Sequence, residues 1–357
     1  MSRLLLVLTG LLVVFGATAV AAPEIQVDAD VYEFEAVTEG VAVSHTFVLT
    51  NVGDEALHID RIRATCGCTT TALATDELAP GQSVDLSIRI NTTGFSGRIS
   101  KTIYVYSTDP RRSSDQADLT LRVSGTVNRA AVYQKTVNDM WYYYVVLVDI
   151  RSADAFQKSH LVGAINVPAA TLEEELDAIP SDGLVVLYDE AGESSSSALV
   201  TLIGHHRDGR VLNGGLAAWM KAYGTLHVFP LPDDLLLPAD SLSATINHSY
   251  VMDAAAVMRV YYILIDLRTP EEYASGHLVG AVNIPYSELD VNNLSAWLGD
   301  LSSSTELILY GQNSSSSDAA AQALRAAGYA RAQSLLGGLD EWTRQYQDRL
   351  LVLPEAE

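Results

Sequence analysis

The feature that most constrains the fold of this chain is a long internal repeat. The segment Asp149–Pro168 recurs as Asp266–Pro285, so these two copies are 117 residues apart. Further along, Gly214-Gly-Leu-Ala-Ala-Trp219 recurs as Gly337-Gly-Leu-Asp-Glu-Trp342, 123 residues apart, which gives the second copy a net insertion of six residues. A repeat of this length indicates duplicated domains and not the short units of a solenoid. We therefore expect two domains of one fold in tandem.

Within each copy, apolar strands alternate with helices. The first strand is predicted at Val145–Asp149 and at Tyr261–Asp266, and the third at Gly183–Tyr188 and at Glu306–Tyr310. Each third strand is followed by a loop and an amphipathic helix. Strands that read as continuous β-branched and leucine runs between helices are typical of a parallel sheet covered on both faces. The repeat therefore predicts two α/β domains with doubly wound parallel sheets.

Both copies resemble rhodanese domains. The resemblance depends on an Asp-x-Arg motif, on the segment His-Leu-x-Gly-Ala-x-Asn-x-Pro and on the closing Gly-Gly-x-x-x-Trp, and it spans residues 133–228 and 245–350. We interpret the Asp-x-Arg pairs as buried or half-buried ion pairs that set the shape of each domain. The resemblance implies that the histidine fixes a turn of the scaffold and takes no part in catalysis. These residues are Asp149, Arg151 and His160 in the first copy, and Asp266, Arg268 and His277 in the second.

The loop after the third strand lacks the family's nucleophile in both copies. Rhodanese-type sulfur transfer, as the resemblance implies, runs through a persulfide on the cysteine of a Cys-x-x-Gly-x-Arg-Ser loop. Backbone N–H groups and a helix N-terminus there hold the sulfur anion. In this chain Asp189 occupies the cysteine position of the first copy and Gly311 that of the second. A carboxylate cannot carry a persulfide and glycine has no attacking atom, so we expect no catalytic residue in either loop.

The two loops differ in charge. Glu190 and Glu193 accompany Asp189 in the first loop, and each carboxylate would repel an anion such as thiosulfate by about 1 kcal/mol or more at close range. The second loop is neutral, and its serines at the start of a helix could hold a small anion or another polar ligand. The alternative is that these serines only cap the helix that follows. The candidate residues are Ser314, Ser315, Ser316 and Ser317.

An N-terminal region precedes the repeat. Residues 24–128 alternate apolar and polar side chains in short runs, for example over residues 84–90, with turn signals between the runs. Alternation with period two predicts about seven strands in an Ig-like β-sandwich. The motifs Asn51-Val-Gly53, Cys66-Gly-Cys68-Thr69 and Leu78-Ala-Pro80-Gly81 resemble an uncharacterised bacterial Ig-like family with a CGCT motif. That resemblance implies a fold and an exported context more than an activity.

Cys66 and Cys68 are the only two cysteines, so any thiol chemistry of this chain depends on them. On a strand, both side chains would share a face with Cα atoms ~6.6 Å apart, from a rise of ~3.3 Å per residue. That separation is near the upper limit for a disulfide, so the bond would be strained and easily reduced unless Gly67 folds the backbone into a turn. Three interpretations stay open: a structural or inert pair, a redox pair, and a soft-metal site that adds His45 or His58.

The first segment and the net charge indicate where the chain works. Residues 1–21 combine a charged start at Arg3, a short apolar run and small residues up to Ala21. This pattern predicts a secretory signal peptide cleaved after Ala21, because the run is shorter than the ~20 residues that span a bilayer. No later segment is apolar enough to cross a membrane, so we expect a periplasmic or secreted protein of a bacterial envelope. The net charge of −22 argues against a nucleic acid partner.

The leading hypothesis is an exported, non-catalytic protein in which an Ig-like module and two degenerate rhodanese-like domains serve binding or assembly. Its partner would be a protein or a small anion. One alternative is a thiol redox protein, sulfur carrier or sulfurtransferase that uses Cys66 and Cys68, and another is a small-anion sensor that uses the neutral loop. We expect no cofactor and no metal.

Overall fold

The computed structural model describes residues 21–111, 116–230 and 250–354. Nearly all of the predicted signal peptide, residues 1–20, lies outside the described residues. The chain divides into two compact units, and the first contains the described residues up to 35 together with 44–90 and 98–125. The second contains residues 36–43 and 91–97 and the chain from residue 126 onward. No helix within the described ranges combines the length and apolarity that a membrane crossing requires.

The first unit is built from two β-sheets, with strand orders β1-β3-β7-β5 and β2-β9-β8-β4-β6. Apolar side chains alternate along the strands; β7, for example, buries Val84, Leu86, Ile88 and Ile90 and exposes most of the residues between them. The strands are β1 (Ile25–Val27), β2 (Val31–Thr38), β3 (Val43–Asn51), β4 (Leu57–Ala64), β5 (Thr69–Leu73), β6 (Glu77–Leu78), β7 (Ser83–Ile90), β8 (Gly97–Ser107) and β9 (Leu119–Asn128).

This arrangement confirms a strand-rich N-terminal domain and corrects the strand count. Nine strands occur among the described residues of 24–128, where about seven were predicted. β1 has three residues and β6 has two, which is too short for an alternating pattern to be recognised in the sequence.

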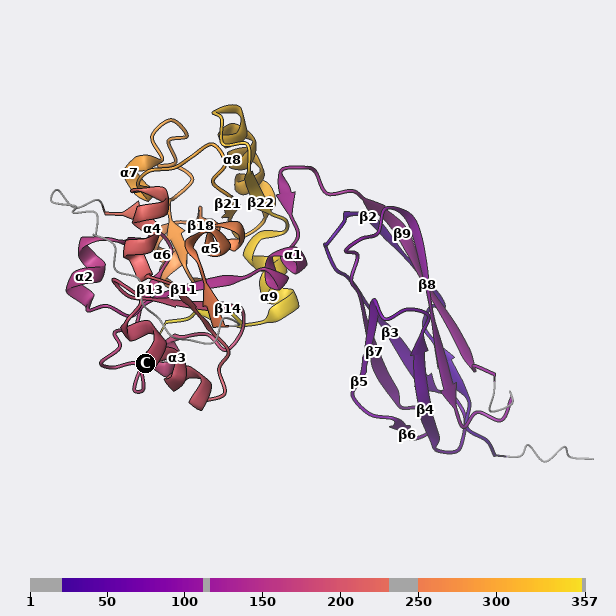
Figure 1. The fold of residues 1–357 in the computed structure, drawn as a ribbon. Helices are drawn as coiled ribbons and strands as arrows, with labels where there is room; N and C mark the ends of the chain where they lie inside the picture. The colour runs from indigo at the N-terminus through magenta and orange to yellow at the C-terminus, as the bar shows by residue number, and fades with distance from the viewer. Residues whose placement is uncertain (1–20, 112–115, 231–249, 355–357) are drawn as a thin grey trace, which may run out of the picture. The chain divides into compact units, whose positions relative to one another are not determined.

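The second unit contains two five-stranded parallel sheets, with orders β13-β11-β14-β15-β17 and β10-β22-β21-β18-β20 (Figure 1). This confirms the predicted α/β region with parallel sheets. The strands of the first copy are β10 (Gln134–Lys135), β11 (Val145–Asp149), β12 (His160–Leu161), β13 (Ile165–Asn166), β14 (Leu184–Tyr188), β15 (Arg210–Leu212) and β16 (Val228–Phe229). Those of the second are β17 (Val251–Met252), β18 (Ile263–Asp266), β19 (His277–Leu278), β20 (Ala281–Asn283), β21 (Leu307–Tyr310), β22 (Ala332–Leu335) and β23 (Leu351–Val352).

The two copies exchange their first strands. β10 is the first strand of the first copy but pairs with β22 of the second, whereas β17 is the first strand of the second copy and pairs with β15 of the first. Each sheet is therefore completed by a strand from the other copy, a feature that a repeat in the sequence does not reveal.

The helices cover both faces of these sheets. Successive residues of β11 enter two different cores, with Val146 and Val148 in one and Leu147 in the other, which explains why the strand is apolar up to Asp149. The helices are α1 (Val137–Tyr142), α2 (Ala153–Lys158), α3 (Ser194–Gly204), α4 (Gly215–Tyr223), α5 (Ala254–Val260), α6 (Pro270–Ala274), α7 (Ser295–Leu298), α8 (Ser314–Ala326) and α9 (Gly338–Tyr346). A 3-10 turn covers Leu176–Ala178.

The contact between the copies is nearly symmetric. The Tyr144 hydroxyl of the first copy donates to the Val279 carbonyl at 2.6 Å, and the equivalent Tyr261 donates to the Val162 carbonyl at 2.5 Å. The helix after each exchanged strand also packs on the other copy: α1 packs on α9, and α5 packs on α4. Both copies consequently share their hydrophobic cores and form one compact unit.

Candidate functional site

The first candidate loop follows β14, and its Asp189 carboxylate is turned inward. Asp189 is only 6% exposed. One carboxylate oxygen accepts a hydrogen bond from the Gly192 N–H, and the other accepts from Ser194 N–H at 2.5 Å and Ser195 N–H at 2.9 Å. These N–H groups lie at the start of α3, where a helix has unpaired donors and a positive dipole end. The side chain at the cysteine position therefore fills the ring of amides that would hold a bound anion.

The other two acidic residues of this loop point away from the amides. The Glu190 carboxylate pairs with the Arg151 guanidinium at 2.8 Å, and Glu193 is exposed. Only one of the three carboxylates expected to repel an anion thus occupies the cradle, and it does so as a hydrogen-bonded ligand of the chain itself. Because the Asp189 carboxylate already occupies these amides, it excludes a bound anion more strongly than the charge repulsion that was argued from the sequence.

The second candidate loop follows β21, and a serine rather than an aspartate occupies the space beside its first residue. A Cβ atom built on Gly311 would lie 2.7 Å from the Ser316 hydroxyl, so the serine closes the space above the glycine. No side chain of residue 311 reaches the amides at the start of α8. The loop thus lacks both a nucleophile and the internal carboxylate of its counterpart.

The serines of the second loop do not cap α8, because its N-cap is Asn313, whose side chain accepts the Ser315 N–H at 2.9 Å. The capping role expected of the serines is therefore wrong. Ser314 accepts a hydrogen bond from the Gly337 N–H at 2.6 Å, and the buried Ser317 donates to the Ser314 carbonyl at 3.3 Å, so both are used in local contacts that close the loop. Anion binding by Ser314–Ser317 stays a prediction.

A Gly-Gly pair closes each loop against the last helix of its copy. The Leu216 N–H of α4 donates to the Asp189 carbonyl at 2.8 Å, and the Leu339 N–H of α9 donates to the Gly311 carbonyl at 3.0 Å. A Cβ atom on Gly215 or Gly338 would lie 2.4 or 2.5 Å from those carbonyl oxygens, and both glycines have positive φ. The repeated Gly-Gly-x-x-x-Trp motif is therefore required by this close approach.

The Asp-x-Arg motifs form buried ion pairs, as predicted. Asp149 pairs with Arg151 at 2.7 Å and Asp266 pairs with Arg268 at 2.6 Å, and both aspartates are fully buried. Burial lowers the pKa of Arg151, but the hydrogen bonds and charge of Asp149 raise it more, so the group stays charged. Each guanidinium also donates to a carbonyl of the turn that precedes the motif histidine, at 2.5 Å to Ser159 in the first copy.

The motif histidines lie in that turn. His160 Nδ1 contacts the Phe156 carbonyl at 2.8 Å and stacks on the Phe156 ring, and His277 repeats both contacts with Tyr273. Burial lowers the pKa of both histidines. These contacts hold the turn after α2 and after α6, which supports a scaffold role.

Cys66 and Cys68 form a disulfide in the first unit, with Cα atoms 5.2 Å apart. Of the two backbone conformations considered for this pair, the structure has the turn: β4 ends at Ala64, and the Thr69 N–H donates to the Cys66 carbonyl at 3.3 Å. Gly67 provides the turn that shortens the Cα separation, and both cysteines are half-buried. Because both sulfurs are used in the bond, they are not thiolate ligands, and His45 stacks on Tyr32 instead.

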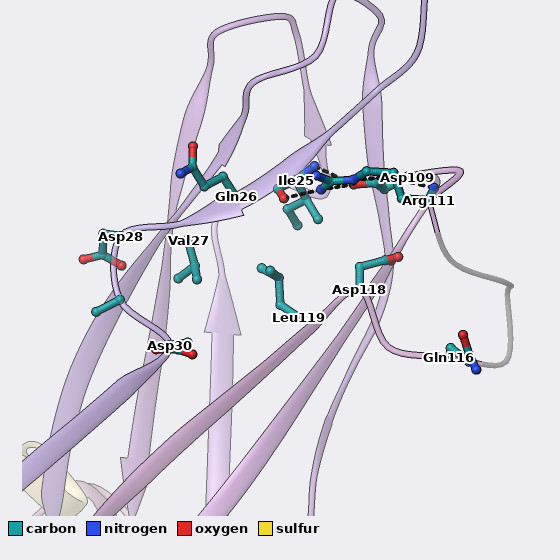
Figure 2. A pocket seen from close by; sticks show the side chains of 11 residues that line it. Ile25, Gln26, Val27, Asp28, Asp30, Asp109, Arg111, Gln116, Asp118 and Leu119 are labelled. Atoms are coloured by element: carbon teal, nitrogen blue, oxygen red, sulfur yellow. Dashed lines mark hydrogen bonds and ion pairs between the residues drawn. The ribbon is translucent and has the colours of Figure 1, made fainter.

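A cavity of about 700 Å³ lies in the first unit, and Figure 2 shows the side chains that line it. Asp109 is paired there with Arg111 and accepts the Ile25 N–H at 2.9 Å, and Asp118 accepts the Ser107 N–H at 2.6 Å. The carboxylates of Asp109 and Asp118 thus tie the ends of strands together. Their arrangement is that of a structural network.

Sequence reasoning did not single out His227. An alignment of the copies on their Gly-Gly-x-x-x-Trp motifs places His227 opposite Leu350, so a histidine takes a leucine position at which both residues are buried. That mismatch was the signal that could have identified it.

In a comparison with known protein families, the profile of the rhodanese-like domain matches residues 135–222 and 252–345. A profile described as a protein of unknown function, DUF1573, matches residues 25–127. A thiosulfate sulfurtransferase of Pseudomonas aeruginosa is 28% identical over 243 residues, which cover 56% of this chain and 88% of that protein. The uncharacterised protein YqhL of Bacillus subtilis is 39% identical over 79 residues, 22% of this chain and 59% of that protein.

Among solved structures, the crystal structure of a Pseudomonas aeruginosa thiosulfate sulfurtransferase aligns with a TM-score of 0.24 and 21% identity. The alignment covers 63% of this chain and 44% of that chain.

Proposed function

The chain belongs to the rhodanese-like family over half of its length, and from this premise we propose that it is a non-catalytic member whose paired domains serve binding or assembly. The two loops that carry the family's chemistry support the proposal, since one presents Asp189 and the other Gly311. A persulfide needs a sulfur nucleophile held against backbone amides. Neither loop supplies one.

The single observation that carries the proposal is the position of the Asp189 carboxylate. It accepts hydrogen bonds from three amides at the start of α3. The carboxylate is buried, so these amides supply the hydrogen bonds that water would otherwise make. A substrate anion would have to displace this carboxylate and leave it buried without donors, which is strongly unfavourable.

The test is thiocyanate formation from thiosulfate and cyanide by the purified chain. We expect no turnover above the uncatalysed rate, and the same result for a Cys66→Ser/Cys68→Ser double variant. An Asp189→Cys variant is the matched control, because it frees the amides and restores a sulfur atom at the loop. It should gain the mass of one sulfur atom after exposure to thiosulfate. Turnover by the unmodified chain that a loop substitution abolishes would overturn the proposal.

A second candidate function rests on the Cys66–Cys68 disulfide. The bond joins two cysteines that are separated only by the exposed Gly67. The Thr69 hydroxyl lies 3.4 Å from the Cys66 sulfur and 3.8 Å from the Cys68 sulfur. A partner thiolate would attack one sulfur, the S–S bond would break, and the other cysteine would leave as a thiolate. A second thiol of the partner would then release the reduced pair and become oxidised. The partner class is therefore a dithiol protein.

Equilibration with mixtures of reduced and oxidised glutathione, followed by thiol trapping and mass spectrometry, tests this candidate. A redox pair should convert between disulfide and dithiol within the range of the glutathione couple. The Cys68→Ser variant cannot form the internal disulfide and should show only the mixed disulfide of Cys66 with glutathione. A pair that stays oxidised across every mixture is a structural staple, which excludes the redox function.

We also propose that the chain works in a bacterial envelope. The pattern of residues 1–21 and the presence of a disulfide support an oxidising compartment. Cell fractionation of a tagged chain should find it outside the cytoplasm and shortened at its N-terminus, and retention at full length in the cytoplasm would contradict this.

A further inference from the structure

The Cys66–Cys68 disulfide lies among basic residues in an otherwise acidic chain. Residues 61–75 include two arginines but no aspartate or glutamate, and residues 86–108 include three basic side chains and no acidic one. The chain as a whole has 44 acidic against 22 basic side chains. Both segments therefore depart from the net charge of −22.

Strand pairing brings a lysine of β8 to the Cys66 side of the turn. β4 leads into this turn and pairs with β8. The pairing continues beyond β4, because the Thr65 N–H donates to the Thr102 carbonyl at 3.0 Å. The next residue of β8 is Lys101, which the antiparallel register places opposite Cys66. Arg63, three residues before Cys66 on β4, is exposed.

The Cys68 side of the turn leads into β5, which borders a groove of about 460 Å³. Serine and threonine residues make up most of the wall of this groove, and Arg89 of β7 adds a positive charge. None of the described residues that line it is acidic. Arg89 is opposite Thr70 in the ladder, and Thr70 is two residues after Cys68. The groove therefore begins beside Cys68.

The acidic residues of the same strands lie farther from the disulfide along the backbone. Asp60 precedes Cys66 by six residues on β4, which is ~20 Å at a rise of ~3.3 Å per residue. Asp85 lies at the end of β7 that faces the far end of β5. Glu33 of β2 is separated from β4 by two strands and pairs with Arg98 at 2.8 Å.

Thr69 gives the two sulfurs different surroundings. The residue is 8% exposed, and its hydroxyl lies 3.4 Å from the Cys66 sulfur and 3.8 Å from the Cys68 sulfur. Neither sulfur of a disulfide carries a proton, so the hydroxyl is the donor in both contacts. A charged thiolate accepts a stronger hydrogen bond than a disulfide sulfur does. The closer sulfur, that of Cys66, is therefore the better leaving group.

Positive charge around a disulfide acts in two ways. Arginine and lysine stabilise a nearby thiolate, which makes a cysteine of the disulfide easier to release. They also attract acidic segments of a partner over about a Debye length, ~10 Å at 0.1 M salt. The net charge of −22 repels an acidic partner from the rest of the chain. A local basic region thus directs such a partner to the disulfide.

We propose that the partner of this disulfide is a dithiol on an acidic segment, and that its thiolate attacks Cys68. This inference rests on the second candidate function, thiol–disulfide exchange. The partner's first thiolate forms a bond to the Cys68 sulfur, and Cys66 leaves as a thiolate with the electron pair of the broken S–S bond. The partner's second thiolate then attacks the partner's own bonded sulfur and releases Cys68. The partner loses two electrons, and its two thiol protons pass through water to the reduced cysteines.

Two synthetic dithiol peptides test the charge of the partner. They share a Cys-x-x-Cys core, which is flanked by glutamates in one and by lysines in the other. Each is added in excess to the whole chain, and thiol trapping with mass spectrometry follows the loss of the disulfide. Rates are compared per thiolate, because flanking charges alter the ionisation of each peptide. At low ionic strength we expect the acidic peptide to react at least about tenfold faster, and this preference should shrink in ~1 M salt.

A charge variant shows whether the basic residues cause this preference. Arg63→Glu should reduce it to about threefold or less, and Arg63→Gln replaces this variant if circular dichroism shows that it does not fold. Lys158→Glu, on the exposed end of α2, makes the same change in net charge and is the matched control. Equal rates for the two peptides, or an unchanged preference in the Arg63 variant, would overturn the proposal. No reduction by either peptide would instead overturn the second candidate function itself.

A peptide with a single cysteine tests the direction of attack, because its reaction stops at the mixed disulfide. After rapid quenching with N-ethylmaleimide, tandem mass spectrometry should find the peptide on Cys68 and the maleimide on Cys66. Thr69→Val, which keeps the shape and removes the hydroxyl, should slow the attack about tenfold and make the distribution more even. A peptide found mainly on Cys66, or an unchanged rate and distribution in Thr69→Val, would overturn the assignment.

Discussion

At the scale of single residues, Asp189 decides what the first loop can do. Its carboxylate is held by the same backbone donors that would hold an anion, so one side chain both removes the nucleophile and fills the site. Gly311 reaches the same chemical result in the second loop by having no side chain. Neither equivalent position thus carries a sulfur atom: one holds a carboxylate and the other has no side chain.

We predict that Asp189→Ala lowers the free energy of unfolding by about 2 kcal/mol, because three amides at the start of α3 lose a charged acceptor. Asp189→Asn should cost less, since the amide oxygen still accepts. Urea unfolding of both variants measures the difference. Equal stability of the alanine variant and the unmodified chain would show that the carboxylate does not stabilise the loop.

His227 makes stability depend on pH. Burial lowers the pKa of His227 from its ordinary 6.5 to about 4, so the unfolded chain binds a proton at a higher pH than the folded chain. The stability contribution is complete above pH 6.5 and is lost as the pH falls towards 4, by about 3 kcal/mol at ~1.4 kcal/mol per pKa unit.

His227→Leu should remove this loss, because leucine is the residue of the equivalent position and does not titrate. Urea unfolding of both proteins between pH 7 and pH 4 measures the divergence of the two stability curves. Parallel curves over that range would mean that His227 is not held neutral by burial.

At the scale of elements, the turn between β4 and β5 is the local feature that most altered our interpretation. A strand would have separated the two cysteines to the limit of bonding, but a turn with Gly67 brings their Cα atoms to 5.2 Å. The same residue pair can therefore be a relaxed link. The remaining question at this scale is how much the link stabilises the sheets around it.

We predict that reduction of Cys66–Cys68 lowers the stability of the first unit by about 2 kcal/mol or less. A disulfide that closes so short a segment removes little entropy from the unfolded chain, whereas a 15-residue loop would be worth about 3 kcal/mol. Urea unfolding with and without a reductant, with the Cys66→Ser/Cys68→Ser variant as control, provides the value. Complete unfolding on reduction would identify the pair as an essential staple.

At the scale of the whole molecule, the two rhodanese-like copies form one compact unit. They exchange β10 and β17, and their shared cores contain strands of both copies. Gly163 and Gly280 meet where the copies touch: a Cβ atom on either would lie 2.7 or 2.8 Å from the carbonyl oxygen of the other. Both have a φ of 79°, which favours glycine.

Gly163→Ala should therefore destabilise both copies together, by about 1–3 kcal/mol from backbone strain and the steric contact. Tryptophan fluorescence and far-UV circular dichroism should report the same shifted midpoint in urea. Gly204→Ala is the matched control, because a Cβ atom there meets nothing within 4 Å. Separate transitions for the two copies would contradict the exchange of strands.

Much of the candidate site was predictable because it depends on residue types at fixed spacing. The replacement of a cysteine by Asp189 or Gly311 was implied by the resemblance to rhodanese domains, and the Asp149–Arg151 ion pair was predicted from the repeated Asp-x-Arg motif. The closure of each loop by the Gly-Gly motif appears only in the structure. The inward turn of the Asp189 carboxylate was not predictable, since a carboxylate in a loop can equally face solvent. The burial of His227 was also hidden, because it appears only when the two copies are packed together in space.

The sequence by itself determined the duplicated α/β fold, the strand-rich N-terminal domain and the absence of a sulfur nucleophile from both loops. These follow from periodicity and from residue identity along the chain. Only the tertiary structure decided that the copies exchange strands, that the cysteines meet in a turn, and that His227 is buried against the second copy. These depend on which distant residues come into contact, and packing across the two copies selects those contacts.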